Sequence, residues 1–359
     1  MPTVALLFGG QSPEHEVSIR SARNIYAAID KSRYQVVLVG IDKAGRWFHL
    51  SESELLNPEL LVVNGRRQLG LIPGARRNQI VYLDGEGHFP QIEVVFPITH
   101  GPYGEDGTLQ GILRHLSLPF VGPDVLGSAA CMDKDVTKRL LREADLLVAP
   151  YLCFHYFEKE AIDYAGVVNQ LGTPLFIKPA NMGSSVGVRK VENKAEFDAA
   201  IAEAFRYDHK ILIEEMILGR EVECAVMGNA IPEATTVGEV VMEETGFYDY
   251  ESKYVSATAA RTDIPALGLD EEMLNKLMLV ARQAYRTLGC EGLSRVDMFV
   301  CEDGKVYINE INTLPGFTQI SMYPKLWAAA DVSYPELLDR LIQFAIERGE
   351  REARLEKSL

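Results

Sequence analysis

The spacing of apolar residues switches repeatedly between strand-like and helix-like patterns. Continuous apolar runs at residues 3–8, 35–41 and 92–99 predict buried strands, and helical spacing over 17–29 predicts a helix between the first two. The first 125 or so residues are therefore expected to form an α/β layer with a parallel sheet. Residues 51–90 are weakly patterned, which indicates an irregular excursion with a short hairpin.

Two further units follow. The second begins near residue 130, where Asp133 is placed to cap a helix that ends near residue 144. Strands are expected at 175–178 and 210–214, separated by a glycine-rich loop at 181–187 and a helix at 196–205. The third unit begins near residue 220 and contains strands, a polar segment at 243–262, a helix at 270–288, a hairpin and a charged helical tail from residue 347.

The hairpin carries the most specific pattern. Residues 293–301 and 305–312 are β-rich runs separated by Asp303-Gly304, and a two-residue Asp-Gly loop is a strong hairpin signal. If Glu302 pairs with Lys305, the same register sets further side chains opposite one another on one face. These predicted pairs are Phe299 with Ile308, Asp297 with Glu310, and Arg295 with Asn312.

Two carboxylates facing each other across adjacent strands repel, so a partly buried pair needs a shared proton or a cation. The oxygen atoms of Asp297, Glu310 and Asn312 suit Mg²⁺ completed by phosphates better than Zn²⁺ or Ca²⁺. The alternative is a solvated hairpin face on which Arg295 serves as an internal counter-ion. The hairpin taken alone leaves both interpretations open.

The loop at 181–187 follows a strand that ends in Lys178. Its small residues would let backbone N–H groups approach phosphate oxygens while the lysine supplies charge. It matches neither phosphate-binding fingerprint, so a plain turn is the alternative. Gly9-Gly10-Gln11 also lacks the G-x-G-x-x-G pattern, which argues against a Rossmann dehydrogenase.

Composition narrows the class of protein. With 359 residues, 47% of them hydrophobic and 24% charged, the chain is long enough for two or three domains. A formal charge of −15 argues against nucleic acid or an anionic membrane as a partner. Five scattered cysteines without a C-x-x-C pair suit reduced thiols, and no stretch is long enough to span a membrane, so we expect a cytoplasmic protein.

Six motifs then follow one another in order. They are Glu14-His15-Glu16-Val17-Ser18, His100-Gly101 with Gly104-Glu105-Asp106-Gly107, Met132-Asp133-Lys134, Lys178-Pro179 with Gly183-Ser184-Ser185-Val186-Gly187, Arg295-Val296-Asp297, and Asn309-Glu310-Ile311-Asn312-Thr313-Leu314-Pro315-Gly316. Together they resemble the D-alanine–D-alanine ligases of the ATP-grasp superfamily, nearly end to end. The resemblance implies an α/β, three-domain ATP-grasp fold: an N-terminal Rossmann-like parallel sheet (1–128), a central α+β domain (129–215) and a C-terminal α+β domain with an antiparallel sheet (216–359).

The resemblance also implies a reaction. The γ-phosphoryl group of ATP would pass to the carboxylate of one D-alanine, and the amine of a second would attack the acyl phosphate through a tetrahedral intermediate. The dipeptide would serve peptidoglycan precursor synthesis. Two Mg²⁺ ions, replaceable by Mn²⁺, and a homodimer are implied as well. Another ATP-grasp carboxylate–amine ligase, or a D-alanine–D-lactate ligase, is the alternative; a non-catalytic nucleotide-binding protein would lack Arg295 or Gly316.

Site residues follow by resemblance, motif by motif. The implied metal ligands are Asp297, Glu310 and Asn312. The implied ATP-binding residues are Lys134, Lys178, Ser184, Ser185, Glu214, Glu215, Ile217, Glu221 and Lys253. The implied substrate-binding residues are Glu14, His100, Arg295, Gly316, Ser321 and Met322. The implied catalytic residues are Glu14, Ser184, Tyr254, Arg295 and Gly316.

Roles can be attached to several of these residues. Arg295 and the N–H of Gly316 would hold the oxyanion of the intermediate, and Glu14 would accept the ammonium of the first D-alanine. Ser184 and Tyr254 would complete a hydrogen-bonded set with Glu14. The segment 243–262 would be a lid that excludes water, with Gly246 and Gly268 as hinges. A tyrosine at 254 implies D-alanine rather than D-lactate as the second substrate.

Overall fold

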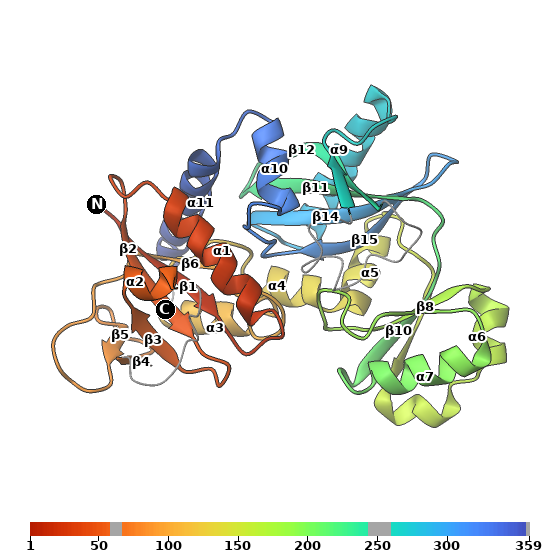
Figure 1. Ribbon diagram of the computed structural model, residues 1–359, viewed down its shortest axis with the longest axis horizontal. Coiled ribbons are helices and arrows are strands. Elements are labelled where there is room, and N and C mark those ends of the chain that lie inside the picture. Colours follow the sequence, from red (N-terminus) through yellow and green to blue (C-terminus); the bar gives the residue numbers. More distant parts are fainter. Residues whose placement is uncertain (58–66, 243–259, 357–359) are drawn as a thin grey trace.

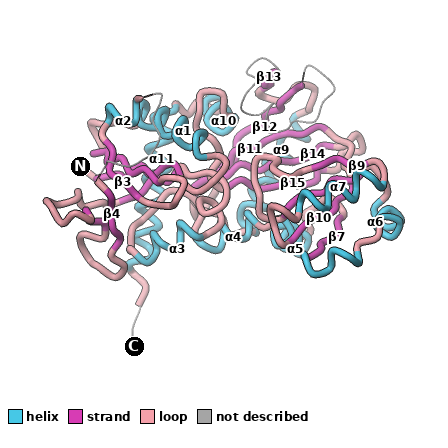
Figure 2. Tube along the Cα trace, turned by 60° about the horizontal axis from the view of Figure 1, so that its bottom comes forward, coloured by secondary structure: helices cyan, strands magenta, loops and turns pink. Residues whose placement is uncertain are grey.

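The computed structural model describes residues 1–57, 67–242 and 260–356 (Figure 1). Within these residues the strands form sheets of six, four and five strands. Figures 1 and 2 place the six-stranded and four-stranded sheets at opposite ends of the molecule, with the five-stranded sheet between them.

The N-terminal sheet has the order β5-β4-β3-β2-β1-β6. Its parallel part confirms the predicted strands: β1 (Thr3–Gly9) pairs in parallel with β2 (Gln35–Ile41) and with β6 (Val94–Pro97), and α1 (His15–Ala28) connects β1 to β2. The remaining strands are antiparallel. A parallel sheet was expected where β3 (Trp47–Leu50) pairs with β2, and that expectation was wrong. The reason is the short connection after β2, where Asp42 N–H donates to Arg46 O (3.0 Å), because a parallel neighbour needs a crossover of a dozen or so residues. The hairpin predicted within 51–90 is formed by β4 (Gln68–Leu71) and β5 (Ile80–Tyr82), and β4 also pairs with β3.

Helices that follow β6 link this sheet to the next, and one more helix lies within the N-terminal unit. A short helix, α2 (Glu52–Leu56), lies in the predicted excursion, and α3 (Thr108–His115) and α4 (Val125–Met132) follow β6. Asp133 then caps α5 (Lys134–Glu143) as predicted, accepting from the N–H groups of Asp135 and Val136 at 3.1 Å each. Lys134, at the first position of α5, is thereby fixed at the buried start of this helix.

The four-stranded sheet is antiparallel, in the order β7-β10-β8-β9. Its strands are β7 (Tyr151–His155), β8 (Leu175–Pro179), β9 (Arg189–Val191) and β10 (Lys210–Glu215). A 3-10 helix, η1 (Tyr156–Ala161), precedes α6 (Tyr164–Leu171), and α7 (Lys194–Ala204) lies between β9 and β10. Apolar residues of the strands pack with residues of α6 and α7 in one core, which keeps the glycine-rich loop between β8 and β9 at the edge of a rigid layer.

The five-stranded sheet has the order β13-β12-β11-β14-β15 and is antiparallel. Its strands are β11 (Arg220–Gly228), β12 (Glu233–Met242), β13 (Ala260–Asp263), β14 (Gly292–Val300) and β15 (Val306–Asn312). The apolar face of α9 (Glu271–Thr287) packs in one core with Val222 and Cys224, whereas Ala225 and Met227 pack in another. The alternation along β11 therefore buries both faces of this sheet.

The two C-terminal helices join the core that contains Ala225 and Met227 to the N-terminal sheet. They are α10 (Met322–Ala329) and α11 (Tyr334–Ala353), and their apolar residues share one cluster with side chains of β1, α1 and β6. Arg348, only 4% exposed, donates from Nη1 to Gly122 O and from Nη2 to Phe120 O, both at 2.6 Å. The tail predicted as a charged helix end thus holds the N-terminal and C-terminal parts together; the domain boundaries at 128 and 215 remain a prediction.

The hairpin of β14 and β15 has the predicted register at the site but not at the turn. Asp297 lies opposite Glu310 and Arg295 opposite Asn312, as predicted. Near the turn, however, Phe299 lies opposite Tyr307 rather than Ile308, and Cys301 N–H donates to Lys305 O (3.0 Å), so the loop holds one more residue. Gly304, with φ +76°, accommodates that longer loop, and a β-bulge between Asp297 and Met298 restores the register.

Candidate active site

Three carboxylates lie side by side across the five-stranded sheet. Glu223 on β11 is the register partner of Asp297 on β14, which in turn is the partner of Glu310 on β15. Asp297 is 4% exposed, so the solvated hairpin face considered above does not form. Glu223 was missed by the sequence analysis because its place beside Asp297 depends on the pairing of strands that are distant in the chain.

Arg295 compensates much of this negative charge. It donates from Nε to Asp297 Oδ1 (2.7 Å) and from Nη2 to Asp297 Oδ2 (2.6 Å), and its Nε lies 2.9 Å from Glu223 Oε2. Burial disfavours the charge of the guanidinium, but Asp297 and Glu223 outweigh it and hold the pKa of Arg295 well above its ordinary value. Arg295 is therefore a counter-ion, as the alternative interpretation had it, in a buried rather than a solvated setting.

Of the two predicted phosphate-binding lysines, the one on α5 contacts this row and the one on the four-stranded sheet contacts another carboxylate. Lys134 Nζ donates to Met182 O (2.7 Å) and lies 3.6 Å from Glu310 Oε2. Lys178 Nζ, at the end of β8, lies 2.8 Å from Glu214 Oε2. The structure thus joins the predicted metal ligands to the predicted phosphate-binding lysines through Lys134 and Glu310. It adds a buried lysine that the sequence analysis missed, Lys138, whose signal was its spacing of one helical turn from Lys134.

The glycine-rich loop between β8 and β9 is tightly turned. Ser184 and Ser185 have φ angles of 51° and 59°, in the left-handed region that non-glycine residues rarely adopt. The turns are closed by Val186 N–H to Gly183 O (3.1 Å) and Val188 N–H to Ser185 O (3.2 Å). Successive backbone N–H groups in such a conformation form an anion-binding concavity, which agrees with the predicted phosphate role of this loop.

Glu14 connects the N-terminal sheet to this loop. It is buried at the N-cap position of α1, where its own N–H donates to Ser12 Oγ (3.1 Å). Its Oε1 accepts a hydrogen bond from Ser184 Oγ, although 170 positions separate the two residues in the chain. Two of the three residues predicted to form a set over the first substrate are thereby brought together, whereas the third, Tyr254, lies outside the described residues, as does Lys253.

His100 and Glu105 bind the backbone that precedes the predicted oxyanion glycine. His100 Nδ1 lies 2.9 Å from Leu314 O, and Glu105 accepts from Leu314 N–H (3.0 Å) and from Gly101 N–H (2.6 Å). Burial lowers the pKa of His100, and burial with the charge of Glu14 raises the pKa of Glu105 to about 8. A neutral pair therefore fixes the segment leading to Gly316. Glu105, part of a quoted motif, had not been assigned to the site.

The predicted second-substrate residues lie just beyond this segment. A Cβ added to Gly316 would come within 2.7 Å of Ser321 Oγ, which itself accepts from Thr318 N–H (3.0 Å). Met322 is 6% exposed and packs in the core, its sulfur 2.7 Å from where a Cβ on Gly238 would be. A groove of about 360 Å³ opens next to Ser321, lined by Arg20, Arg23, Asn24, Thr318, Gln319 and Ile320.

The residues predicted for adenine and ribose lie along the end of β10 and the start of β11. Glu214 is buried between lysines, whereas Glu215 is exposed and Ile217 is half-buried. Glu221 is exposed on β11, and its Oε1 accepts from Asn309 Nδ2 (3.3 Å). These residues lie on and beside the connection that joins the four-stranded sheet to the five-stranded sheet.

The donor set of the hairpin can be tested for a metal. Asp297, Glu310 and Asn312 offer carboxylate and amide oxygens, which is the chemistry of a Mg²⁺ site, and Asn312 Oδ1 already accepts from Leu314 N–H (3.2 Å). Among the described residues, no group of three His, Cys, Asp or Glu side chains converges on a metal-sized point. The residues fit the ion by the chemistry of their oxygen atoms, and in this structure both carboxylate oxygens of Asp297 are bound by Arg295.

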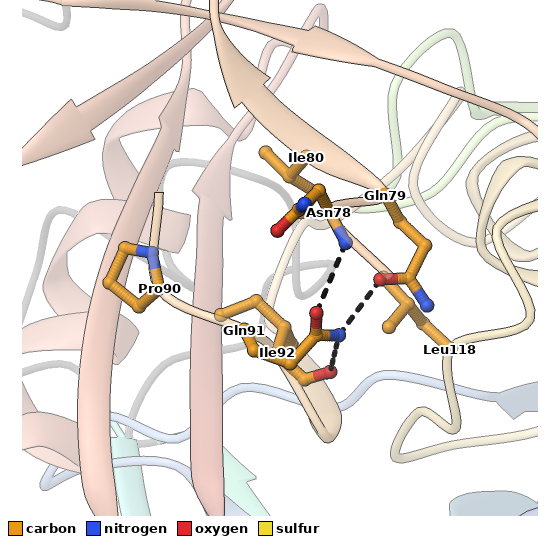
Figure 3. Close-up of a pocket in the computed structure, with 7 residues that line it drawn as sticks. All are labelled: Asn78, Gln79, Ile80, Pro90, Gln91, Ile92 and Leu118. Carbon is orange, nitrogen blue, oxygen red and sulfur yellow. Dashed lines mark hydrogen bonds between the residues drawn. The ribbon is translucent and has the colours of Figure 1, made fainter. Parts of the chain in front are cut away.

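A second pocket has no part in this site. Figure 3 shows it at the edge of the N-terminal sheet, where the side-chain amide of Gln91 accepts from Asn78 N–H (3.1 Å) and donates to Gln79 Oε1 (2.9 Å). Its lining residues are Asn78, Gln79, Ile80, Pro90, Gln91, Ile92 and Leu118. None of them is charged, and they belong to none of the predicted site motifs.

Comparisons with known proteins agree with this arrangement. Family models described as "D-ala D-ala ligase N-terminus" and "D-ala D-ala ligase C-terminus" match residues 3–123 and 140–343. A D-alanine--D-alanine ligase of Shouchella clausii is 54% identical over 362 residues, with 99% of this chain and 98% of the relative covered. The solved D-alanine-D-alanine ligase of Coxiella burnetii has a TM-score of 0.86 at 37% identity, covering 99% of this chain and 98% of its own.

A third relative shows the same fold with a different named substrate. The VanG D-Ala:D-Ser ligase of Enterococcus faecalis has a TM-score of 0.86 at 36% identity, covering 96% of this chain and 99% of its own. The two antiparallel sheets, the contact of Lys134 on α5 with Glu310 on β15, and the match to a solved ligase together define a ligase of the ATP-grasp fold. The chain belongs to the D-alanine–D-alanine ligase family. In the part of the chain that the structure describes, no helix is long and apolar enough to cross a membrane.

Proposed function

We propose that this chain uses ATP to join two D-alanines into D-alanyl-D-alanine through an acyl phosphate, for cell-wall precursor synthesis. The observation that carries the proposal is the hydrogen bond from Ser184 to Glu14, which brings an acid suited to an amino group to a loop suited to phosphates. The ligases that this chain resembles over 99% of its length carry the same name as the proposed activity.

The first D-alanine would bind with its ammonium at Glu14. Its carboxylate would then point toward the seam between the sheets, where Lys134, Lys178 and the loop around Ser185 would hold the phosphates of ATP. A carboxylate oxygen attacks the γ-phosphorus and ADP leaves. An acyl phosphate hydrolyses readily in water. The buried position of Glu14 favours protection of the acyl phosphate from solvent.

The second D-alanine would attack the acyl carbon with its amine. The negative charge that develops on the carbonyl oxygen would be held by the guanidinium of Arg295 and the N–H of Gly316, and inorganic phosphate leaves as the peptide bond forms. Losing one such donor typically costs about 3 kcal/mol of transition-state stabilisation. Ser321 and the groove beside it would receive the second D-alanine, with Arg20 among the residues that line the groove.

The metal is proposed to be Mg²⁺, two ions held by Asp297, Glu310 and Asn312. Bound there, it would supply charge neutralisation for the phosphates. Arg295 would serve the site by balancing Asp297 and Glu223.

Further parts of the proposal concern assembly and place of action. A homodimer and a cytoplasmic site of action are proposed, the latter supported by five cysteines that are all free thiols. Residues 243–259 of the predicted lid segment 243–262, and with them Gly246, lie outside the described residues; the segment is proposed to act as a lid, with Gly268, at φ +73°, as one hinge. D-alanine is proposed as the second substrate because Tyr254 stands at the position that separates dipeptide makers from depsipeptide makers.

The test is turnover of the purified chain with ATP and Mg²⁺. Phosphate release and D-alanyl-D-alanine are expected with D-alanine and neither with L-alanine. When D-lactate or D-serine is added in competition, D-alanyl-D-alanine is expected to remain the main product at neutral pH. Equal phosphate release with D-alanine and L-alanine would falsify the proposal, and preferential ester formation would contradict the choice of second substrate.

A further inference from the structure

Lys138 lies behind the nucleotide site and is not among the residues assigned to it so far. It occupies the second turn of α5, and its side chain is 1% exposed. Its Nζ lies 3.2 Å from Glu214 Oε1, while Lys178 Nζ lies 2.8 Å from the other oxygen of the same carboxylate. The three groups form a row of lysine, carboxylate and lysine, referred to below as the Lys138–Glu214–Lys178 row.

We propose that Lys138 is a positioning residue for the nucleotide. It partly neutralises the carboxylate of Glu214, so that the positive charge of Lys178 remains available to the phosphates of ATP. The inference rests on the proposed function, because it takes Lys178 and Glu214 as nucleotide-binding residues. Lys138 itself would touch neither substrate nor metal.

Burying an ammonium group costs free energy unless a partner compensates its charge. A buried lysine is expected either to lose its proton or to be held by a carboxylate. Burial lowers the pKa of Lys138 to about 8, with Glu214 opposing this shift and Lys178 adding to it. Neither Lys138 Nζ nor Glu214 Oε1 has a well-aligned hydrogen bond, so the pair contributes charge more than a directional contact.

Charge balance then decides the effect on Lys178. With Lys138 in place, the row carries two ammonium groups and one carboxylate, a net charge of +1. Without Lys138, Glu214 and Lys178 would neutralise each other, and the attraction of Lys178 for a polyphosphate would fall. The charge of the whole protein is −15, so a local surplus of positive charge has to be built at the nucleotide site.

A purely structural lysine would behave differently. If Lys138 only filled space, a neutral side chain of similar length would preserve nucleotide affinity. If it only satisfied Glu214 by hydrogen bonding, a glutamine would serve. A positioning residue acting through charge requires a positive charge at this position, and only an arginine would retain nucleotide affinity.

The experiment compares Lys138→Met, Lys138→Gln and Lys138→Arg in the full chain. Titration calorimetry measures the affinity for ADP with Mg²⁺, and steady-state kinetics measures kcat and the KM values for ATP and D-alanine. The Gln variant keeps a polar partner for Glu214 and serves if the Met variant does not fold. The matched control is Arg139→Met, a neighbouring exposed residue on the same helix that pairs with Asp135.

The Met and Gln variants are expected to bind ADP about tenfold more weakly and to raise the KM for ATP by a similar factor. This magnitude corresponds to the loss of roughly one charge-assisted contact. kcat and the KM for D-alanine should change less than about twofold, the Arg variant should retain most of the ADP affinity, and Arg139→Met should match wild type. Unchanged ADP affinity in Lys138→Gln would overturn the inference. If wild type binds ADP but makes no dipeptide, the proposed function fails while the ADP titrations still decide the role of Lys138.

Discussion

Ser184 donates a hydrogen bond to Glu14, and this contact ties the loop between β8 and β9 to the start of α1. The contact is partly buried and joins two segments that the sequence placed in different domains. At this contact a carboxylate suited to bind an amine lies beside a loop suited to bind phosphates, which is what the proposed reaction requires.

Substitution of Ser184 tests the role of this contact. Ser184→Ala leaves Glu14 without this donor, and the first D-alanine would bind a less ordered carboxylate. We expect the KM for D-alanine at the first site to rise about tenfold, because one hydrogen bond to a charged group is lost. The KM for ATP should change less. Initial-rate measurements at varied D-alanine concentration check this, with Ser53→Ala on the exposed helix α2 as the control.

Gly316 tests the fit between the oxyanion segment and Ser321. A Cβ at this position would lie 2.7 Å from Ser321 Oγ, so Gly316→Ala should displace the segment and lower turnover at least tenfold. The matched control is Gly111→Ala in α3, where an added Cβ meets nothing within 4 Å. Because glycine in a helix costs about 1 kcal/mol relative to alanine, the control should be as stable as wild type or more so and fully active. Equal losses in the two variants would contradict the account.

Glu105 sets a prediction for pH dependence. Burial raises its pKa to about 8 from the ordinary 4.5, so the folded state binds a proton that the unfolded state has lost between these values. The resulting stability is fully present below about pH 4.5 and declines as pH rises through about 8. Glu105→Gln should flatten that decline at a cost of about 1 kcal/mol for one imperfect hydrogen bond. Unfolding by urea at pH 5, 6.5 and 8 measures both effects; an unchanged pH slope would contradict the assignment.

Asp297 is the direct test of the proposed metal platform. Asp297→Asn should reduce turnover and raise the Mg²⁺ concentration needed for half-maximal rate, because a neutral amide is a weaker ligand than a carboxylate. It should also lower stability, by about 3 kcal/mol at most, since Arg295 loses a partner that it contacts through two nitrogens. A magnesium titration and thermal unfolding measure the two effects, and Asp303→Asn in the exposed turn is the matched control. Unchanged turnover would leave the hairpin as scaffold.

Much of the fold was predictable because local pattern and turn chemistry decide it. The strand at 35–41 and the cap at Asp133 were predicted from adjacent residues alone. The pairing of Asp297 with Glu310 was also predicted, although two unforeseen features cancel: the loop is one residue longer than expected, and a bulge in β15 shifts the register back by one residue. Local sequence does not reveal a bulge, because its cause is the packing of both strands.

The missed residues share one physical reason. Glu223 joins the site through the pairing of β11 with β14, and Lys138 through the approach of α5 to β10. Glu105 acts on Leu314, 209 positions further along the chain. Each of these contacts depends on tertiary structure, and an isolated charged residue is more often solvated than buried. Motif spacing therefore indicated the candidate site residues but not the charged residues that contact them.

The measurement that tests the central claim most directly follows oxygen from D-alanine into phosphate. With D-alanine labelled by ¹⁸O in both carboxylate oxygens, activation as an acyl phosphate transfers one labelled oxygen to each phosphate released. We predict that mass spectrometry of the phosphate finds one ¹⁸O per molecule, formed together with D-alanyl-D-alanine. Phosphate without ¹⁸O would show that water or another nucleophile attacks ATP, and it would contradict the proposed ligation.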